Sequence, residues 1–481
     1  MTAISRRAFT RAVASALALG AIAPVHAATP DEHVEAIAGA LSPMVVVKGE
    51  TPRTVSLAER MGQLKVPAVS IAYFDRGRIE WARAWGMADR ERGVLATRDT
   101  LFQAGSISKP VSAIAALRLV ERGDLQLDAN VNDRLTSWKL PDNPFTKDRK
   151  VTVRNILNHT AGTTVWGFPG YDRDTPSPSL PRLLDGQGNT EAVRVFKVPG
   201  ESWRYSGGGY TILQLLLTDV TGRPFPELLQ REVLAPAGMR ASTFEQPPGD
   251  MARARMAVGY LGDGTRVQGD WHLYPEMAAA GLWTTAEDLA RFAMAVQQAA
   301  RGGGSLLSRT TAQLMLRPGQ NNHGLGPVLS PDGLRFGHGG ADWGFQGELT
   351  AHVDGGPGVA ILTNSDNGGV LARQIIQTIA REYGWAGESL KPQQRERITL
   401  STEALRAYVG RYVGPGGRFQ IMAGDGVLRL ILEGNPEAEL VPEAPDRFFF
   451  RDNGVTVRFE GKGEEMTFIP PNGTRIPRIE R

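Results

Sequence analysis

Two groups of short apolar runs near the ends of the chain enclose a long central stretch in which apolar residues recur at helical spacing. Residues 69–74 and 79–85 are rich in β-branched and aromatic side chains, and Arg76-Gly77 between them predicts a β-hairpin. Four later runs predict strands at residues 325–329, 334–336, 346–353 and 359–363. Strands at both ends with helices between them indicate one α/β sheet whose outer strands come from both ends of the chain.

The clearest helix signal covers residues 107–122, and Gly123 follows it as a stop signal. Proline is tolerated only near the start of a helix, so Pro110 places Ser106 at or just before the first turn. Lys109 precedes the proline, which mildly disfavours its helical conformation. Residues 31–64 are expected to form helix and loop, and residues 151–298 mostly helices with long loops. Further helices are expected at residues 210–220 and 371–383. A capping box at Thr284-Thr285-Ala286-Glu287 predicts the start of another helix, which runs through residue 296.

The pattern changes near the C-terminus. Residues 386–398 are polar and contain Pro392, which is typical of a linker. Residues 410–479 then show short alternating runs separated by Gly, Pro, Asn and Asp, which predicts a small antiparallel barrel or sandwich. We see no catalytic constellation in this last part.

The first 27 residues have the pattern of a secretion signal, with Arg6-Arg7, an Ala/Leu-rich stretch and a Val25-His26-Ala27 cleavage site. The paired arginines predict export to the periplasm by the twin-arginine route, and a general secretion signal is the alternative. The apolar stretch is too short to span a bilayer, so no stable membrane insertion is expected. The predicted division is a signal at 1–27, a main domain at 28–390, a linker at 391–399 and a β-domain at 400–481.

Composition narrows the class of protein. Hydrophobic residues make up 41% of the chain and charged residues 22%, as in a soluble globular protein. The net charge of +3 falls to about zero when the three arginines of residues 1–27 are removed, which argues against a nucleic-acid partner. The chain has no cysteine, which excludes disulfides and thiol catalysis, and its seven histidines show no metal-binding spacing. We therefore expect neither metal nor cofactor, and the sequence leaves the oligomeric state open.

Ser106 and Lys109 are the first candidate catalytic residues. A serine is inert at its free pKa and needs a nearby base, and residues three apart lie on the same face of a helix. At the helix N-terminus, free N–H groups and the helix dipole favour developing negative charge. The structural alternative is an N-cap serine with a solvated lysine.

Tyr205 and His338 are the next candidates. Tyr205 follows Trp203-Arg204 and precedes Ser206-Gly207, in a glycine-rich turn before the helix at residue 210. A phenol near cationic groups loses its proton more readily and can act as a general acid or base. The alternative is a structural turn tyrosine.

His338 lies at the end of the strand predicted at residues 334–336 and is followed by Gly339, Gly340 and Ala341. Glycines there let a substrate backbone approach the strand edge. The N–H groups of Ser106 and Ala341 could then form an oxyanion hole, in which each donor is typically worth ~10²–10³ in rate. A lone histidine is otherwise more often a satisfied structural residue.

With these motifs in this order, the chain resembles the serine β-lactamase/penicillin-binding-protein superfamily, specifically its class C-like branch of esterases, D-aminopeptidases and DD-peptidases. Further matching segments are VTVRNILNHTAG at 151–162, PAGM at 236–239 and AAGLWTT at 279–285. The resemblance covers about residues 35–385, and residues 400–481 resemble the lipocalin-like β-domain of many members. It implies an antiparallel sheet flanked by helices, an all-helical region and a small C-terminal barrel.

The resemblance also implies roles. Ser106 is the acylated nucleophile, Lys109 and Tyr205 share proton transfer, and His338 stands where the third motif, Lys-Thr-Gly, has lysine. Which of Lys109 and Tyr205 is the general base stays open.

Two departures from the family pattern bear on the substrate. Gly207 replaces the asparagine that usually holds the amide of the acyl group. His338 and Gly339 replace the lysine and hydroxyl that β-lactamases usually present to the substrate carboxylate. We therefore expect a serine hydrolase acting on a small-molecule ester or small peptide, the peptide with D-residues as one option. The alternatives are a weak β-lactamase or DD-carboxypeptidase and, from another class, a non-catalytic binding protein on the same fold.

Overall fold

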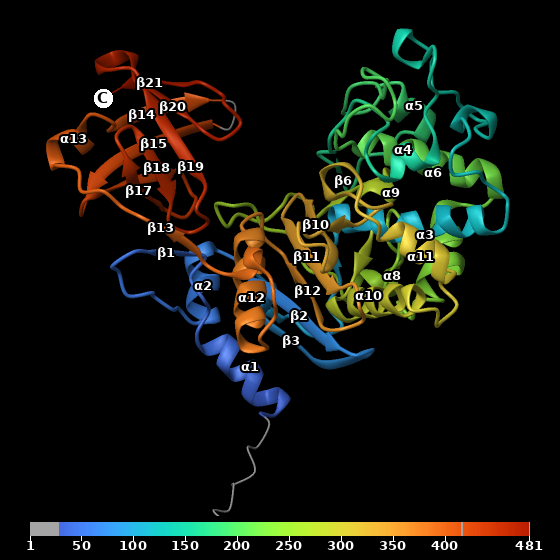
Figure 1. Ribbon diagram of the computed structural model, residues 1–481, viewed down its shortest axis with the longest axis horizontal. Helices are drawn as coiled ribbons and strands as arrows, with labels where there is room; N and C mark the ends of the chain where they lie inside the picture. Colours follow the sequence, from blue (N-terminus) through green and yellow to red (C-terminus); the bar gives the residue numbers. More distant parts are fainter. Residues whose placement is uncertain (1–27, 415–416, 481) are drawn as a thin grey trace, which may run out of the picture.

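The main feature of the fold is a seven-stranded antiparallel sheet. The computed structural model describes residues 28–414 and 417–480, so the predicted secretion signal lies outside the described residues. The strand order is β4-β3-β2-β12-β11-β10-β9, and its central strands are labelled in Figure 1. The strands are β2 (Ala68–Asp75), β3 (Arg78–Asp89), β4 (Val94–Leu95), β9 (Val328–Leu329), β10 (Arg335–Asp342), β11 (Phe345–His352) and β12 (Gly358–Thr363). Because β2 pairs with β12, the sheet combines strands from residues 68–95 with strands from residues 328–363, which confirms the prediction.

The predicted hairpin is confirmed as well. β2 and β3 pair in register from Ala68 with Gly86 to Asp75 with Arg78. The two residues between them, Arg76 and Gly77, have φ of 47° and 79°. Left-handed backbone at both central positions is what a tight turn between twisted strands requires.

Helices cover both faces of the sheet, and β2 shows the effect, because its residues are mostly apolar and those on both faces are buried. Val69, Ile71 and Tyr73 pack into one cluster with α12 (Gly368–Glu382) and with α1 (Pro30–Gly39) and α2 (Leu57–Leu64). The alternate residues Ala68, Ala72 and Phe74 pack into the larger cluster that contains α10 (Ala286–Ala300). Side chains alternate across a strand, so a strand between two helical layers is buried on both sides.

Most of the remaining helices form a separate helical part on one side of the sheet. The central helix of this part is α3 (Ser108–Glu121), which is buried around almost its whole circumference. The other helices of this part are α4 (Val153–Leu157), α5 (Leu180–Leu184), α6 (Gly207–Thr221), α7 (Phe225–Leu229), α8 (Asp250–Arg253), α9 (Met277–Ala280) and α11 (Arg309–Met315). Long loops join them, as predicted. Two-residue strands pair within the loops, β5 (Phe102–Gln103) with β8 (Trp283–Thr284) and β6 (Tyr171–Asp172) with β7 (His272–Leu273).

Several predicted boundaries were wrong, as three examples show. α6 begins at Gly207 and not at residue 210, because the Ser206 hydroxyl caps it by accepting from Gly209 N–H at 3.1 Å, and the glycines of its first turn carry no apolar pattern. The cap of α10 is Thr285, whose hydroxyl accepts from Asp288 N–H at 3.1 Å, while Thr284 is a strand residue. β10 runs through the glycines to Asp342, so His338 lies inside the strand and not at its end. The glycines interrupt the alternation of apolar and polar side chains by which a strand is recognised in a sequence. In the structure β10 nevertheless pairs with β11 without a break.

The C-terminal part is a closed eight-stranded antiparallel barrel, which confirms the barrel of the two alternatives. Its strands are β14 (Gly410–Gly414), β15 (Gly417–Gly424), β16 (Val427–Leu432), β17 (Ala438–Ala444), β18 (Arg447–Phe450), β19 (Thr456–Glu460), β20 (Thr467–Ile469) and β21 (Ile476–Glu480), preceded by α13 (Thr402–Arg406). Aromatic side chains such as Tyr412, Phe448 and Phe459 fill it.

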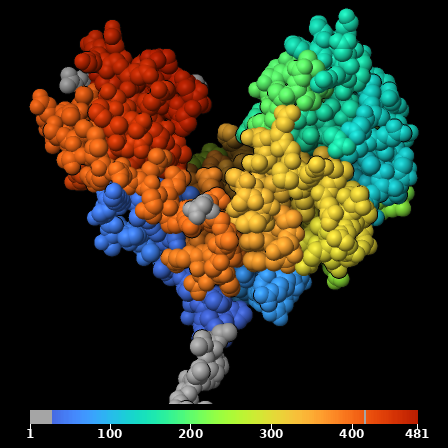
Figure 2. All heavy atoms as spheres, viewed as in Figure 1, coloured from blue at the N-terminus to red at the C-terminus, as the bar shows by residue number. Residues whose placement is uncertain are grey.

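The segment interpreted as a linker contains a strand. β13 (Gln393–Arg395) pairs in parallel with β1 (Val45–Val47), which lies in the region expected to be helix and loop. The sequence Gln-Gln-Arg has no apolar alternation, so only its partner strand makes it extended. Ion pairs reinforce this junction: Glu50 binds Arg397 at 3.0 Å and Arg451, in the barrel, at 2.8 Å. The barrel and the helical part stand apart, with a hollow between them (Figure 2). No helix within residues 28–414 and 417–480 has both the length and the apolar content to cross a bilayer.

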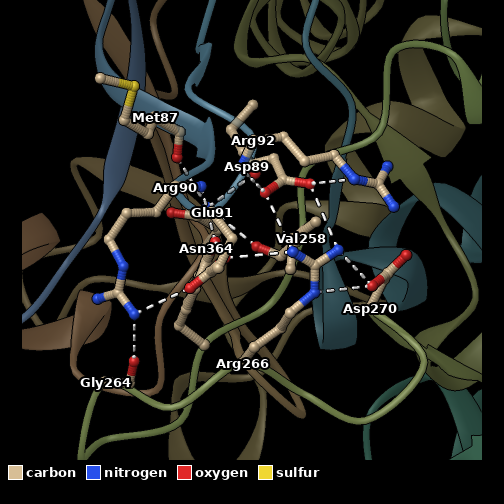
Figure 3. A network of polar contacts seen from close by, with 12 residues as sticks. Met87, Asp89, Arg90, Glu91, Arg92, Val258, Gly264, Arg266, Asp270 and Asn364 are labelled. Carbon is tan, nitrogen blue, oxygen red and sulfur yellow. Dashed lines mark hydrogen bonds and ion pairs between the residues drawn. The ribbon is translucent and has the colours of Figure 1, made fainter.

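A polar network ties the long loop before β7 to the end of β3 (Figure 3). Arg266 donates to Asp89 at 3.0 Å and to Asp270 at 2.6 Å. The Asp89 side chain is only 7% exposed, so its carboxylate has little contact with water and is held by Arg266. From this loop the chain continues through β7 to Tyr274 and Glu276, in the region described below.

Arg266→Met is expected to lower the free energy of unfolding by about 2–3 kcal/mol, because it leaves the Asp89 carboxylate buried without its main partner. Arg92→Met is the matched control, since Arg92 approaches the same carboxylate at 3.5 Å from an exposed position. Urea unfolding of both variants measures the difference. Equal losses would contradict the assignment of Arg266 as the residue that holds this loop.

Candidate active site

The turn that carries Ser106 is pressed against the middle of β10. It is a single 3₁₀ turn, Gly105–Ile107, directly before α3, which agrees with the position that Pro110 predicted. Gly105 has φ of 50°, and a Cβ there would lie 2.5 Å from Ala341 N. A Cβ on Gly340 would lie 1.9 Å from Ala104 O. Only glycine at positions 105 and 340 lets the turn and β10 pack this closely. The close packing brings the Ser106 peptide beside Ala341.

Lys109 is the immediate partner of Ser106. Its Nζ donates to Ser106 Oγ at 2.8 Å and to Ala279 O, in α9, at 2.9 Å. The lysine side chain is almost fully buried. The two bonds fix the amine against the serine hydroxyl, which is the geometry that a serine needs for activation.

Tyr205 joins the same group. Its ring centroid lies 5.0 Å from Lys109 Nζ, and the ring stacks on His159 at 4.3 Å. The following residue, Ser206, caps α6: its hydroxyl accepts from Gly209 N–H at 3.1 Å, and its N–H donates to His159 Nδ1 at 3.2 Å. The phenol is therefore held at the entrance of α6, beside the Ser106–Lys109 pair.

His338 lies close to Tyr205. Its side chain is uncharged, whereas the lysine of the family's third motif carries a positive charge. Its Nδ1–H donates to Gly339 O, and its ring centroid lies 6.1 Å from that of Tyr205. Burial, and secondarily the charge of Lys109, lowers the pKa of His338 to about 3. The imidazole is neutral at pH 7, so this position supplies no positive charge to a substrate.

The structure thus brings together Ser106, Lys109, Tyr205, His338 and Ala341. Gly340 faces Ala104, as described above. Gly339 faces the opposite side of β10 from Gly340, where a Cβ would lie 3.1 Å from Glu348 Oε1. Gly207 is the first residue of α6, and the space beside it is occupied by Phe168.

Two histidines of the site had no role in the sequence analysis. His159 lies within a segment that carried the family resemblance, and burial lowers its pKa well below the usual range. His323 was missed altogether: its ring lies 5.0 Å from His159 and 6.3 Å from Tyr205. Asn321 and Asn322 before it have φ of 52° and 57°, and this left-handed turn was the one available signal. Within the described residues neither nitrogen of His323 has a hydrogen-bond partner.

Two buried acids, Asp342 and Glu276, were also missed, and the first of them lies near Lys109. Asp342 shares a face of β10 with His338, and burial raises its pKa well above the usual range. Glu276 is fully buried directly before α9, and both its carboxyl oxygens lack a hydrogen-bond partner among the described residues. Burial raises the pKa of Glu276 to about 7. In the described part of the chain, no three acidic or histidine side chains converge as ligands of a metal would.

The raised pKa of Glu276 predicts a pH-dependent cost to stability. Between its ordinary pKa of 4.5 and about 7 the folded protein holds a proton that the unfolded chain has lost, so stability falls as pH rises through this window. Glu276→Gln removes this dependence. Relative to the wild type, the variant is expected to gain about 2–3 kcal/mol on going from pH 5 to pH 8.

Urea unfolding at the two pH values measures this change. The exposed Glu433→Gln is the control and should follow the wild type. A Glu276→Gln variant that keeps the wild-type pH dependence would contradict the prediction.

The chain is similar to several known proteins in sequence and in fold. The sequence model of the beta-lactamase family matches residues 56–382. Penicillin-binding protein 4* of Bacillus subtilis (strain 168) is 24% identical over 447 residues, which are 86% of this chain and 95% of that protein. Esterase EstB of Burkholderia gladioli is 36% identical over 179 residues, 35% of this chain and 44% of that protein.

Among solved structures, the octameric penicillin-binding protein homologue from Pyrococcus abyssi has a similar fold. It is 24% identical with a TM-score of 0.59, and the match covers 87% of this chain and 98% of that one. The fold, the family match and the Ser106–Lys109 geometry lead to one conclusion: the chain belongs to the beta-lactamase family.

Proposed function

We propose that this protein is a serine hydrolase that forms an acyl-enzyme on Ser106 and transfers the acyl group of an ester to water. The observation that carries the proposal is the 2.8 Å hydrogen bond between Ser106 Oγ and the buried Lys109 Nζ. A binding protein has no need of a buried amine against a serine hydroxyl. The family includes esterases and D-aminopeptidases, which makes hydrolysis the expected reaction class.

The reaction needs only groups of this site. A base, Lys109 or Tyr205, takes the proton from Ser106 Oγ as the oxygen bonds to the ester carbonyl carbon. In this proposal the N–H groups of Ser106 and Ala341 stabilise the negative oxygen of the intermediate. The carbon–oxygen bond to the alcohol then breaks, and the alcohol leaves with the proton. Water attacks the acyl-enzyme in the same way, releasing the carboxylic acid and returning the proton to Ser106.

Two features favour an ester over a β-lactam. His338 is neutral and offers no cation to the carboxylate that β-lactams carry. Gly207 offers no amide to the acyl group. We also propose, from the pattern of residues 1–27, that the protein works in the periplasm; cell fractionation tests this.

The function is tested with the purified full-length protein on three substrates: a short-chain p-nitrophenyl ester, a D-alanine p-nitroanilide and a chromogenic cephalosporin. We expect the ester to have the highest kcat/KM, and a fluorophosphonate probe to label Ser106, located by peptide mass mapping. Faster turnover of the cephalosporin would contradict the ester preference. Failure of all three substrates and of labelling would favour the binding-protein alternative.

A further inference from the structure

An aromatic segment lies directly beside Tyr205. Val165 has φ of 63°, which for a buried β-branched residue is a genuine backbone outlier. Such strain persists only where the surroundings enforce it, and it concentrates at functional sites. The next residue, Trp166, is 69% exposed, and its ring centroid lies 5.5 Å from that of Tyr205. The strained backbone thus presents an indole to solvent at the site.

Phe168 occupies the place of the missing asparagine. A Cβ on Gly207 would lie 2.7 Å from Phe168 Cε2 and 3.2 Å from Trp166 O, so no side chain fits there with the ring in place. The position from which an asparagine would bind the amide of an acyl group is covered by a phenyl ring.

The start of α6 offers this corner no replacement donors. Gly207 N–H donates to Trp166 O and Gly208 N–H donates to Val165 O, both at 3.1 Å. Gly209 N–H is taken by Ser206 Oγ. Because the protein itself satisfies these first-turn donors, none of them is free to bind an amide carbonyl of the acyl group.

The segment borders an open hollow of about 520 Å³, lined by residues 165–169 and by Thr190 and Glu191. Its backbone is anchored at both ends. Thr164 N–H donates to Arg194 O at 2.9 Å, and His272 Nδ1 bonds Pro169 O at 2.9 Å. The aromatic wall is therefore held in place beside the site.

We propose that this hollow, formed around Trp166 and Phe168, binds the acyl group of the substrate and selects apolar acyl chains over acyl groups that carry an amide. The inference rests on the proposed function, because it assumes an acyl-enzyme on Ser106. Each methylene buried against the two rings should raise kcat/KM about fourfold. An amide packed against the two rings would lose hydrogen bonds to water and gain none from the rings or from the first turn of α6.

The test uses two p-nitrophenyl esters of equal chain length, the pentanoate and the N-acetylglycinate, with the acetate as reference. Each kcat/KM is divided by the rate constant of that ester's own hydrolysis by hydroxide, which removes the difference in intrinsic reactivity. For the full-length wild type we expect the pentanoate to exceed the N-acetylglycinate by at least about tenfold. Trp166→Ala and Phe168→Ala should each lower that ratio at least about fivefold, whereas Phe168→Leu, which keeps an apolar side chain, should retain most of it.

Fluorophosphonate titration of Ser106 counts the folded active sites in every variant, so a misfolded protein is recognised. Phe145→Ala is the matched control, because Phe145 is an exposed aromatic residue outside the site and its loss should leave the ratio unchanged. A wild-type ratio near one, or a ratio that neither Trp166→Ala nor Phe168→Ala changes, would overturn this inference while the proposed function stands. Absence of ester turnover together with absence of labelling would overturn both.

Discussion

Replacing Ser106 by alanine is expected to lower kcat/KM for a p-nitrophenyl ester by at least about 10⁴-fold. The hydroxyl is the only proposed nucleophile, and loss of the nucleophile in a serine hydrolase removes almost all catalysis except that due to binding and the oxyanion hole. The fold should be unaffected, because the change removes one oxygen whose partner, Lys109, keeps its bond to Ala279 O. The measurement is the initial rate on the ester, with a thermal unfolding curve for each protein.

Ser112→Ala is the matched control for this experiment. Ser112 lies on the same helix, α3, is fully buried, and its hydroxyl has no hydrogen-bond partner among the described residues. Its loss is expected to leave the rate within about twofold of the wild type. If Ser106→Ala kept more than a tenth of the wild-type activity, the acyl-enzyme on Ser106 would be wrong.

Replacing Lys109 by methionine is expected to lower kcat/KM by about 10³-fold. The variant keeps the length of the side chain in its buried site but removes the amine that holds Ser106 Oγ, and general acid–base catalysis contributes ~10²–10⁴ in rate. Because the acylation step uses the base, the second-order rate of fluorophosphonate labelling should fall with kcat/KM. Lys147→Met, the same change at an exposed position, is the control.

The same experiment addresses the choice of base. Tyr205→Phe is compared with Lys109→Met across the pH range of activity. If Lys109 is the base, Tyr205→Phe retains the larger share of the rate, and the opposite order assigns the role to Tyr205. A Lys109→Met variant that labels and turns over at the wild-type rate would contradict a role for the amine in activation.

Much of the fold followed from local patterns. The hairpin of β2 and β3 was predictable because two β-branched runs flank a two-residue turn, and α3 because proline and glycine mark its two ends. The spacing of Ser106 and Lys109 placed both side chains on one helical face without any tertiary information. These features depend on contacts between residues close in the sequence, which the periodicity of apolar residues records.

Other features depend on partners far apart in the chain. β13 is extended only because β1, almost 350 residues earlier, pairs with it. His323, Glu276 and Phe168 carry no motif, and the loops that hold them reach the site by packing on β10 and α6. The low pKa of His338 likewise comes from burial and from Lys109, neither of which its neighbours in the sequence reveal.

The sequence by itself therefore determined the main strands of the sheet, the β-rich C-terminal part, the central helix and the Ser106–Lys109 pair, because each is encoded in local spacing and alternation. Only the tertiary structure decided what surrounds that pair: a neutral His338 in place of a cation, two further histidines, buried acids and a phenyl ring against Gly207. Burial and proximity set these properties, and both arise from contacts between segments that are distant along the chain.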